Sequence, residues 1–170
     1  MDISSVIRDI PDFPKPGVLF RDITPVLHNP EVYADAVEQM VKKLEGLDFD
    51  YIAGPESRGF LFGVPIALRL GKGFIPVRKA GKLPYKTVGR AYALEYGEAV
   101  IEIHEDAMGK GDRIVVVDDL LATGGTCHAL CKLVEEVGGS VEALVFLIEL
   151  KDLGGRALLD GYNVKSIIEY

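Results

Sequence analysis

Residues 113–126 read Arg-Ile-Val-Val-Val-Asp-Asp-Leu-Leu-Ala-Thr-Gly-Gly-Thr, and they give the clearest indication of the fold. After the arginine, its first residues are continuously apolar, which is typical of a central strand covered on both faces. Gly124 and Gly125 then mark a tight turn, in which both are expected to adopt positive φ. A helix is predicted over 126–137, so the stretch forms a strand-turn-helix unit.

Strands and helices alternate on either side of this unit. Strands are predicted over 51–53, 74–77, 99–103, 113–117, 141–148 and 163–168. Helices are predicted over about 30–44, 60–70 and 126–137. Such alternation predicts an α/β fold, a mostly parallel twisted sheet with helices on both faces. Ligands of these sheets bind beyond the carboxyl ends of the strands, at a switch point, so the decisive loops should follow strands.

The 170 residues are expected to form one domain, 1–170, with two irregular parts. The first, about 1–30, is rich in proline and turn residues, and 13–17 is expected to be stiff and extended. The second, about 79–97, is dominated by Gly, Lys, Thr, Arg and Tyr and has poor periodicity. A long mobile loop is predicted there, and loops of this length inside compact domains tend to be functional.

Composition and charge argue against several classes of protein. Hydrophobic residues make up 48% of the chain and charged residues 26%, so a packed core is expected. Nineteen basic and 26 acidic residues give a net charge of −7, which repels nucleic acid overall. No apolar run approaches the roughly 20 residues that span a bilayer, and the start lacks the pattern of a secretory signal. We therefore expect a cytoplasmic protein with no nucleic-acid or membrane partner.

Two cysteines, Cys127 and Cys131, are spaced i, i+4 on the predicted helix over 126–137. A disulfide is not expected at this spacing on one helix face. His128 between them suggests a metal site, but it points off that face and no fourth ligand is evident. Buried or half-buried thiols are therefore expected.

The predicted strand over 113–117 delivers two carboxylates, Asp118 and Asp119, next to the glycine turn. Backbone N–H groups of the turn, threonine hydroxyls and the helix N-terminus together form a cradle for a phosphate dianion. The carboxylates can accept hydrogen bonds from two vicinal hydroxyls, or help to hold a hydrated Mg²⁺. Phosphate cradle and diol acceptors side by side describe a ribose 5-phosphate site. Its predicted residues are Asp118, Asp119, Ala122, Thr123, Gly124, Gly125 and Thr126.

An alternative reading of 113–126 is an ordinary corner with a solvated acidic pair. It explains the glycines but not the adjacent acids, which repel each other unless a cation or ligand compensates. Two other phosphate motifs fail: 54–59 has the glycine spacing of a P-loop, but Phe60 stands where a lysine is required. The segment 71–73 follows a predicted helix and lacks the third glycine of a dinucleotide fingerprint.

A second loop suited to an anion follows the predicted strand over 51–53 and reads Gly-Pro-Glu-Ser-Arg-Gly. Glycines, Ser57 and a helix N-terminus suit an anion, and Arg58 supplies a forked cation for a diphosphate. Taken alone, the loop fits a plain turn with a surface arginine equally well.

Residues 115–126 resemble, without interruption, the motif by which type I phosphoribosyltransferases bind 5-phosphoribosyl-1-diphosphate (PRPP). The resemblance implies that family's fold, with an N-terminal hood (about 1–30) over the base and a mobile catalytic loop (about 79–97). The loop 54–59 corresponds to the family's pyrophosphate loop, which implies a non-proline cis peptide between Glu56 and Ser57.

Further landmarks narrow the resemblance to the adenine phosphoribosyltransferase family. They are Phe-Pro-Lys-Pro-Gly-Val-Leu-Phe-Arg-Asp-Ile-Thr-Pro, Gly-Phe-Leu-Phe-Gly, Pro-Val-Arg-Lys, Gly-Lys-Leu-Pro and Leu-Glu-Tyr-Gly, at 13–25, 59–63, 76–79, 81–84 and 94–97. They cover the chain from about Val6 to Glu149, whereas 85–93 matches only loosely. The resemblance implies a purine salvage enzyme that converts adenine and PRPP into AMP and diphosphate.

The hood is implied to read the base. Backbone groups of Leu19 and Arg21 would recognise the 6-amino edge of adenine, with Phe20 packed on the ring. A backbone carbonyl that accepts from an amine is left unpaired against a 6-oxo group, and buried mismatches of this kind discriminate strongly. The alternative for Phe20 is a core residue.

Charged residues are implied to carry the chemistry. Arg58 and Lys79 would stabilise the leaving diphosphate together with Arg78. The resemblance leaves open whether Arg78 or Lys79 acts across a dimer interface. Glu95 would act as the acid–base residue, and Tyr96 would close over the base with it. The implied catalytic residues are Glu95, Arg58 and Lys79, and the further substrate-binding residues are Leu19, Phe20, Arg21, Ser57, Arg78 and Tyr96.

The resemblance also implies Mg²⁺ as a cofactor and a homodimer as the assembly. No direct metal ligand is expected, although Asp118 and Asp119 can act through water. A transferase for 6-oxopurines or xanthine is the near alternative. A PRPP sensor that controls nucleic-acid binding needs a basic surface that this acidic chain lacks. A non-catalytic scaffold leaves the acidic pair unexplained.

Overall fold

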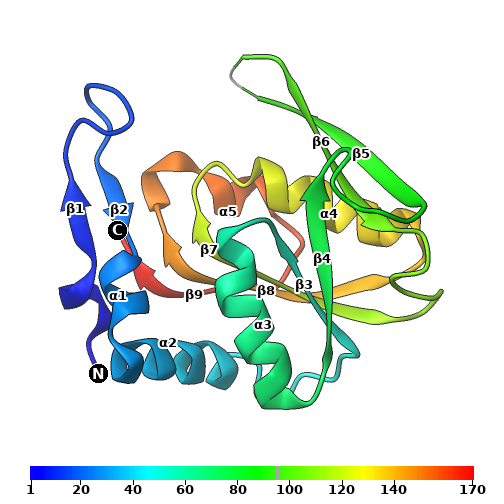
Figure 1. Ribbon diagram of the computed structural model, residues 1–170, viewed down its shortest axis with the longest axis horizontal. Coiled ribbons are helices and arrows are strands. Elements are labelled where there is room, and N and C mark those ends of the chain that lie inside the picture. The colour runs from blue at the N-terminus through cyan, green and yellow to red at the C-terminus, as the bar shows by residue number, and fades with distance from the viewer. Residues whose placement is uncertain (95) are drawn as a thin grey trace. The chain divides into compact units, whose positions relative to one another are not determined.

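A computed structural model describes residues 1–94 and 96–170, which divide into two compact units, Met1–Gln39 and Met40–Tyr170 (Figure 1). The elements of the first unit are η1 (Ile3–Val6), β1 (Arg8–Ile10), β2 (Phe20–Asp22), α1 (Thr24–His28) and most of α2 (Pro30–Lys42). β1 and β2 pair in antiparallel orientation. Asn29 caps α2, because its Oδ1 accepts the N–H groups of Glu31 and Val32 at 3.0 and 3.2 Å.

The prediction that 13–17 is extended is wrong, because this segment is the turn that joins β1 to β2. The Phe13–Pro14 peptide is cis. The Gly17 N–H donates to Asp12 Oδ1 at 2.8 Å, and the Phe13 N–H donates to Val18 O at 3.1 Å. A short aspartate side chain that accepts from a nearby backbone N–H favours a turn over an extended chain.

The second unit is built on a seven-stranded sheet with the order β5-β6-β4-β3-β7-β8-β9 (Figure 1). β4, β3, β7, β8 and β9 are parallel, and β5 and β6 form an antiparallel hairpin beside β4. The strands are β3 (Tyr51–Pro55), β4 (Gly73–Lys79), β5 (Thr87–Ala93), β6 (Glu98–His104), β7 (Arg113–Leu121), β8 (Ser140–Glu149) and β9 (Val164–Glu169). The helices are α3 (Arg58–Leu70), α4 (Gly125–Glu136), η2 (Lys151–Leu153) and α5 (Gly155–Leu158).

α3 and α4 lie on opposite faces of the sheet (Figure 1). α3 connects β3 to β4 on one side, whereas α4 connects β7 to β8 in the other direction. Because parallel crossovers are right-handed, a reversal of direction puts the two helices on opposite faces. The reversal falls between the neighbouring strands β3 and β7, so the loops that follow them meet at the switch point. The α/β prediction is confirmed.

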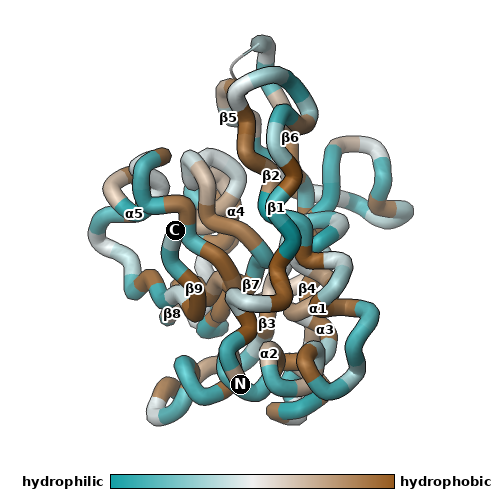
Figure 2. Tube along the Cα trace, turned by 90° about the vertical axis from the view of Figure 1, so that its left-hand side faces the viewer, coloured by the Kyte–Doolittle hydropathy of each residue, from teal (hydrophilic) through white to brown (hydrophobic). Residues whose placement is uncertain are grey.

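The core lies between the sheet and its helices. Residues 114–117 of β7 are fully buried, because β3 and β8 flank this strand and helices cover both faces, as their apolar run predicts. Figure 2 shows apolar residues concentrated in the strands and polar ones in the loops. Cys127 and Cys131 are buried free thiols, as expected, and burial raises the pKa of Cys131 to about 12. No helix in the described part of the chain is long and apolar enough to cross a membrane.

The segment 79–97, predicted as one long loop, contains the strand β5, which pairs along its whole length with β6. Its side chains alternate between exposed and half-buried, and Val88 and Tyr92 pack against the core. Arg90 also forms an ion pair with Glu136 at the end of α4. The alternation is hard to recognise because small residues occupy three of the seven positions.

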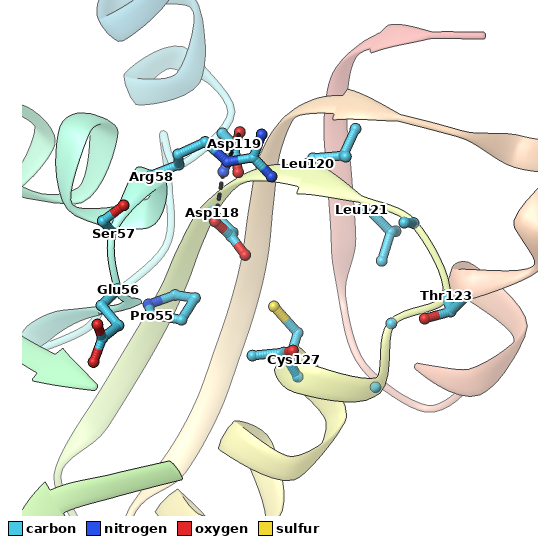
Figure 3. A pocket seen from close by; sticks show the side chains of 14 residues that line it. Pro55, Glu56, Ser57, Arg58, Asp118, Asp119, Leu120, Leu121, Thr123 and Cys127 are labelled. Atoms are coloured by element: carbon cyan, nitrogen blue, oxygen red, sulfur yellow. Dashed lines mark hydrogen bonds and ion pairs between the residues drawn. The ribbon is translucent and has the colours of Figure 1, made fainter. Parts of the chain in front are cut away.

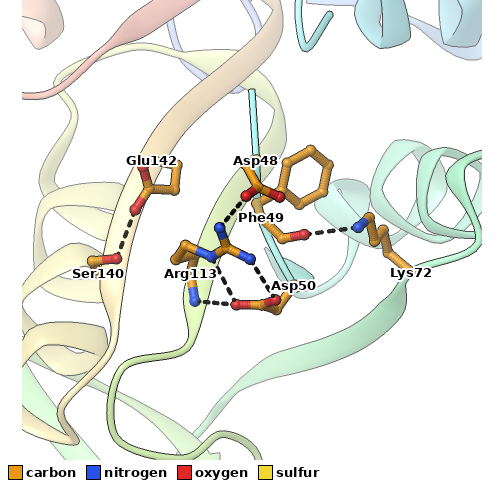
Figure 4. A network of polar contacts seen from close by, with 7 residues as sticks. All are labelled: Asp48, Phe49, Asp50, Lys72, Arg113, Ser140 and Glu142. Carbon is orange, nitrogen blue, oxygen red and sulfur yellow. Dashed lines mark hydrogen bonds and ion pairs between the residues drawn. The ribbon is translucent and has the colours of Figure 1, made fainter. Parts of the chain in front are cut away.

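An ion-pair network joins the amino ends of β3 and β7, at the sheet edge away from the switch point (Figure 4). The Arg113 guanidinium donates to Asp50 from Nη2 at 3.0 Å and also pairs with Asp48. The Arg113 backbone N–H donates to Asp50 Oδ2 at 2.8 Å. Lys72 Nζ donates to the Phe49 carbonyl at 2.8 Å.

Candidate active site

A cavity of about 260 Å³ lies where the loops after β3 and β7 meet, and we call it the main cavity (Figure 3). β3 and β7 are parallel neighbours, so their carboxyl ends lie at the same edge of the sheet. The residues that line the main cavity are Pro55, Glu56, Ser57, Arg58, Asp118, Asp119, Leu120, Leu121, Ala122, Thr123, Gly124, Gly125, Thr126 and Cys127. Nine of the residues predicted for the site are therefore brought together.

One wall of the main cavity is the turn from β7 into α4. Gly124 has φ +85°, as predicted, and is the N-cap of α4. Gly125 does not have the predicted positive φ, because the helix begins at this residue rather than at Thr126. The first N–H groups of an α-helix have no partner within the helix. Those of Gly125, Thr126 and Cys127 line the cavity, where the helix dipole favours an anion.

Asp118 and Asp119 lie within β7, which extends past the predicted end at 117 to Leu121. Asp119 is only 3% exposed, so the alternative of a solvated acidic pair is wrong. The Asp119 N–H donates to Asp118 Oδ1 at 2.8 Å. Burial, and then the neighbouring Asp119 carboxylate, raise the pKa of Asp118 well above its ordinary value.

Arg58 compensates the second carboxylate. It extends from the start of α3 across the cavity, and its Nε lies 3.1 Å from Asp119 Oδ2 (Figure 3). The sequence predicts both residues for the site but not their ion pair. The parallel pairing of β3 and β7 explains it, because that pairing brings the two loops together. Arg58, predicted to bind the diphosphate, and Asp119, predicted to accept from the ribose hydroxyls, thus bind each other in this structure.

The loop after β3 contains the cis peptide between Glu56 and Ser57, as implied by the resemblance. The Glu56 side chain, for which no role is predicted from the sequence, joins this loop to the end of β4. Its Oε1 accepts the Lys79 N–H at 2.7 Å and lies 3.4 Å from Arg78 Nε. The hydrogen bond from the Lys79 backbone is the main reason that the pKa of Glu56 is lowered. A sequence pattern could have predicted this contact: an acidic residue follows one predicted strand, and two basic residues follow the next predicted strand.

Arg78 and Lys79 line a second, smaller cavity of about 100 Å³, which we call the side cavity. The two cavities share Pro55, Glu56 and Thr126. Tyr92 of β5 also lines the side cavity, and its hydroxyl accepts a hydrogen bond from Thr126 Oγ1 at 3.1 Å. Tyr92 falls in the segment 85–93, where the resemblance is loose, so no role is predicted for it.

The remaining predicted residues lie elsewhere in the chain. Phe20 and Arg21 are in β2, paired with Ile10 and Asp9 of β1, and Leu19 precedes them and is exposed. Phe20 is half-buried, and its ring packs edge-on to that of Phe13 at 5.1 Å.

Two predicted residues fall in the sequence between β5 and β6. Tyr96 is 85% exposed near the tip. Glu95 lies outside the described residues.

The side chains at the site limit how a metal ion could bind. Among the described residues, no group of three or more His, Cys, Asp or Glu side chains could hold an ion directly. Asp118 and Asp119 are the carboxylates at the main cavity besides Glu56. Mg²⁺ is usually bound through one or two carboxylates, several waters and substrate phosphates, so this donor set fits an ion that arrives with a phosphorylated ligand.

Comparison with known proteins agrees with this geometry. Residues 23–168 match the model of the phosphoribosyl transferase domain. The chain is 57% identical to adenine phosphoribosyltransferase of Caldanaerobacter subterraneus subsp. tengcongensis, over 99% of this chain and 98% of that protein.

Two solved structures share the fold closely. Adenine phosphoribosyltransferase from Thermoanaerobacter pseudethanolicus has 56% identity and a TM-score of 0.97, with 99% of this chain and 98% of that chain covered. The enzyme from Saccharomyces cerevisiae, complexed with an imino-altritol bisphosphate and adenine, has 38% identity and a TM-score of 0.90, with 96% and 94% covered. The chain therefore belongs to the phosphoribosyl transferase family, within its group of adenine phosphoribosyltransferases.

Proposed function

We propose that this protein transfers the 5-phosphoribosyl group of PRPP to adenine, giving AMP and diphosphate. The observation that carries the proposal is the main cavity, in which a phosphate-binding turn, an acidic pair and Arg58 line one space. Each of the three fits one part of PRPP. The full-length likeness to adenine phosphoribosyltransferases supports adenine as the acceptor.

The 5-phosphate binds at the turn into α4. Backbone N–H groups of Gly124, Gly125 and Thr126 donate to its oxygens, and the hydroxyls of Thr123 and Thr126 add further donors. Ala122 leads into this turn and offers only its backbone. The helix N-terminus supplies a fixed partial positive charge that needs no reorganisation when the dianion arrives.

When PRPP binds, its ribose and its diphosphate replace the contact between Arg58 and Asp119, and each group binds one of the two residues. Asp119 accepts hydrogen bonds from the ribose hydroxyls with Asp118, whereas Arg58 turns to the diphosphate. A ligand that carries both groups compensates both residues at once, which favours PRPP over a ligand with only one of them. Ser57 adds a hydroxyl beside Arg58.

Bond breaking at the anomeric carbon leaves negative charge on the diphosphate and positive charge on the ribose. Arg58 and Lys79 stabilise the leaving group, with Arg78 held nearby by Glu56. Mg²⁺, when bound with the diphosphate, neutralises part of its charge. Asp118 and Asp119 would hold that ion through water, as their place in the main cavity allows.

The base is assigned to residues that the resemblance implies. Backbone groups of Leu19 and Arg21 recognise the 6-amino group, with Phe20 on the ring. Glu95 takes a proton from the imidazole half of adenine as N9 attacks, and Tyr96 closes over the base. Closure excludes water that would otherwise hydrolyse PRPP.

A homodimer in the cytoplasm completes the proposal. Leu61, Val64 and Leu68 recur on one side of α3 at helical spacing and are 37%, 38% and 77% exposed, which supports a protein partner on this helix. A second copy of the chain is the proposed partner.

Product analysis tests the proposed reaction. Incubation with PRPP, Mg²⁺ and adenine should give AMP and diphosphate in equal amounts. PRPP without a base should release diphosphate much more slowly, because the site excludes water only when it is filled and closed. Diphosphate release at the same rate with and without adenine would identify a PRPP hydrolase instead.

A further inference from the structure

The segment that follows β8 packs against the phosphate-binding turn, although the sequence around it is the least diagnostic part of the chain. The Leu150 N–H donates to the Leu121 carbonyl at 2.9 Å, which ties this segment to the end of β7. Gly155, the first residue of α5, lies behind Gly124. A Cβ atom on Gly124 would lie 3.0 Å from Gly155 O and 3.2 Å from Gly155 Cα.

The contact requires glycine at 155. A Cβ atom there would lie 2.4 Å from the Ala122 carbonyl oxygen and 2.7 Å from Leu121 Cδ1. The first of these neighbours is backbone of the turn itself, so it cannot rotate away as a side chain would. Gly155 therefore touches the turn at Ala122 and at Gly124, the two ends of its tightest part.

An ion pair between the half-exposed Arg156 side chain and the buried Glu149 carboxylate holds Gly155 in this position. Arg156, the next residue, donates to Glu149 at the end of β8 from Nε at 2.9 Å and from Nη2 at 2.5 Å. Its Nη1 donates to the Val164 carbonyl of β9 at 2.8 Å, and Ser166 Oγ donates to Glu149 at 2.8 Å. Glu149 is only 3% exposed, and a forked pair of this kind fixes direction as well as distance.

We infer, on the basis of the proposed function, that Gly155 is a positioning residue for the 5-phosphate, held in place by Arg156 and Glu149. It supports the turn from behind, so that the N–H groups on the other side keep hydrogen-bond distance to the phosphate. Such bonds weaken steeply when distance or angle departs from the optimum. Close-packed backbone transmits a displacement of Gly155 to Ala122 and Gly124.

Calorimetry with ribose 5-phosphate and steady-state kinetics on the full chain test this role. Gly155→Ala pushes the turn away from α5, so the Kd for ribose 5-phosphate should rise about tenfold or more. The KM for PRPP should rise in parallel, whereas kcat at saturating PRPP should stay within about threefold. A raised KM with a nearly unchanged kcat is the result expected when a variant weakens substrate binding but not the chemical step.

Gly139→Ala is the matched control. Its Cβ would lie 3.0 Å from Met108 Sδ and Val134 Cγ1, so it also crowds the interior, but beyond the opposite end of α4. It should lower the Tm without changing the Kd for ribose 5-phosphate. An equal loss of binding in both variants would mean general destabilisation and would overturn the positioning role.

Arg156→Lys keeps the charge but cannot form the fork to Glu149, so it tests the same idea if Gly155→Ala does not fold. It should weaken ribose 5-phosphate binding about threefold with kcat unchanged. Folded variants that bind ribose 5-phosphate like the wild type would overturn the inference. Wild-type protein that binds neither ribose 5-phosphate nor PRPP would instead contradict the proposed function, and this inference with it.

Discussion

Asp118 and Asp119 are adjacent in sequence but differ in their charge balance. Arg58 compensates Asp119 directly, whereas burial and the neighbouring carboxylate favour the neutral form of Asp118. Neither carboxylate is therefore needed as a charge to hold β7 in the sheet. Their placement suits ligand binding better than folding.

Replacing both carboxylates should separate stability from activity. Asp118→Asn with Asp119→Asn removes the like-charge repulsion and leaves Arg58, whose side chain is 43% exposed, able to reach water. The Tm should hold or rise while turnover collapses. Thermal melting and diphosphate release measure the two effects, with the exposed Asp160→Asn as a surface control. An active double variant would remove the ribose assignment.

Gly125 tests the phosphate cradle. A Cβ atom on Gly125 would meet only Tyr92 Cδ2, at 3.8 Å, so the free protein has room for a side chain there. Valine should project into the space of the phosphate and weaken PRPP binding by at least about 100-fold, with a folded protein. Calorimetry measures the affinity, and Gly125→Ala should be intermediate. Near-normal PRPP affinity in folded Gly125→Val would contradict the cradle.

Asp50 makes a pH-dependent contribution to stability. The hydrogen bonds from Arg113 lower its pKa from 3.8 to about 2. A carboxyl group whose pKa is lower in the folded state than in the unfolded state stabilises the protein at pH values above the unfolded-state pKa. This stabilisation is lost as the pH falls through the folded-state pKa. The free energy of unfolding of wild type should therefore approach that of Asp50→Asn between pH 4 and 2. Denaturant titrations at several pH values measure it, and a constant difference would contradict it.

At the scale of elements, continuous motifs are predicted well and elements stabilised by distant contacts are not. The unit of β7 and α4 follows from a local pattern, an apolar run that ends in a glycine turn. β5 does not, because it is stabilised by pairing with β6 and by packing of Tyr92 on the core. β1 and β2 are three residues long, too short for their periodicity to be visible.

Glu95 carries the acid–base prediction. Glu95→Gln keeps the size of the side chain but cannot accept a proton, so the chemical step should slow by about 10²–10⁴-fold. PRPP affinity should change little, because only the proton acceptor is lost. Single-turnover kinetics measure the step, with Glu98→Gln in β6 as the control. If the chemical step in Glu95→Gln runs at the wild-type rate, Glu95 is not the acid–base residue.

At the scale of the whole molecule, the candidate site depends on contacts between segments far apart in the chain. The Arg58–Asp119 pair, the link of Glu56 to Arg78 and Lys79, and the support of Gly124 by Gly155 each join two or more elements. A pattern within one segment predicts which residues carry chemistry. It cannot predict which of them touch, because that follows from strand order and register.

A comparison of purine bases tests whether adenine is the acceptor. The kcat/KM for diphosphate release from PRPP and Mg²⁺ should be measured with adenine, hypoxanthine, guanine and xanthine. A backbone acceptor that faces the 6-amino group is left unpaired by a 6-oxo group, so adenine should be preferred by about 10⁴-fold or more. Comparable turnover of hypoxanthine or guanine would contradict the assignment of this chain as an enzyme of adenine salvage.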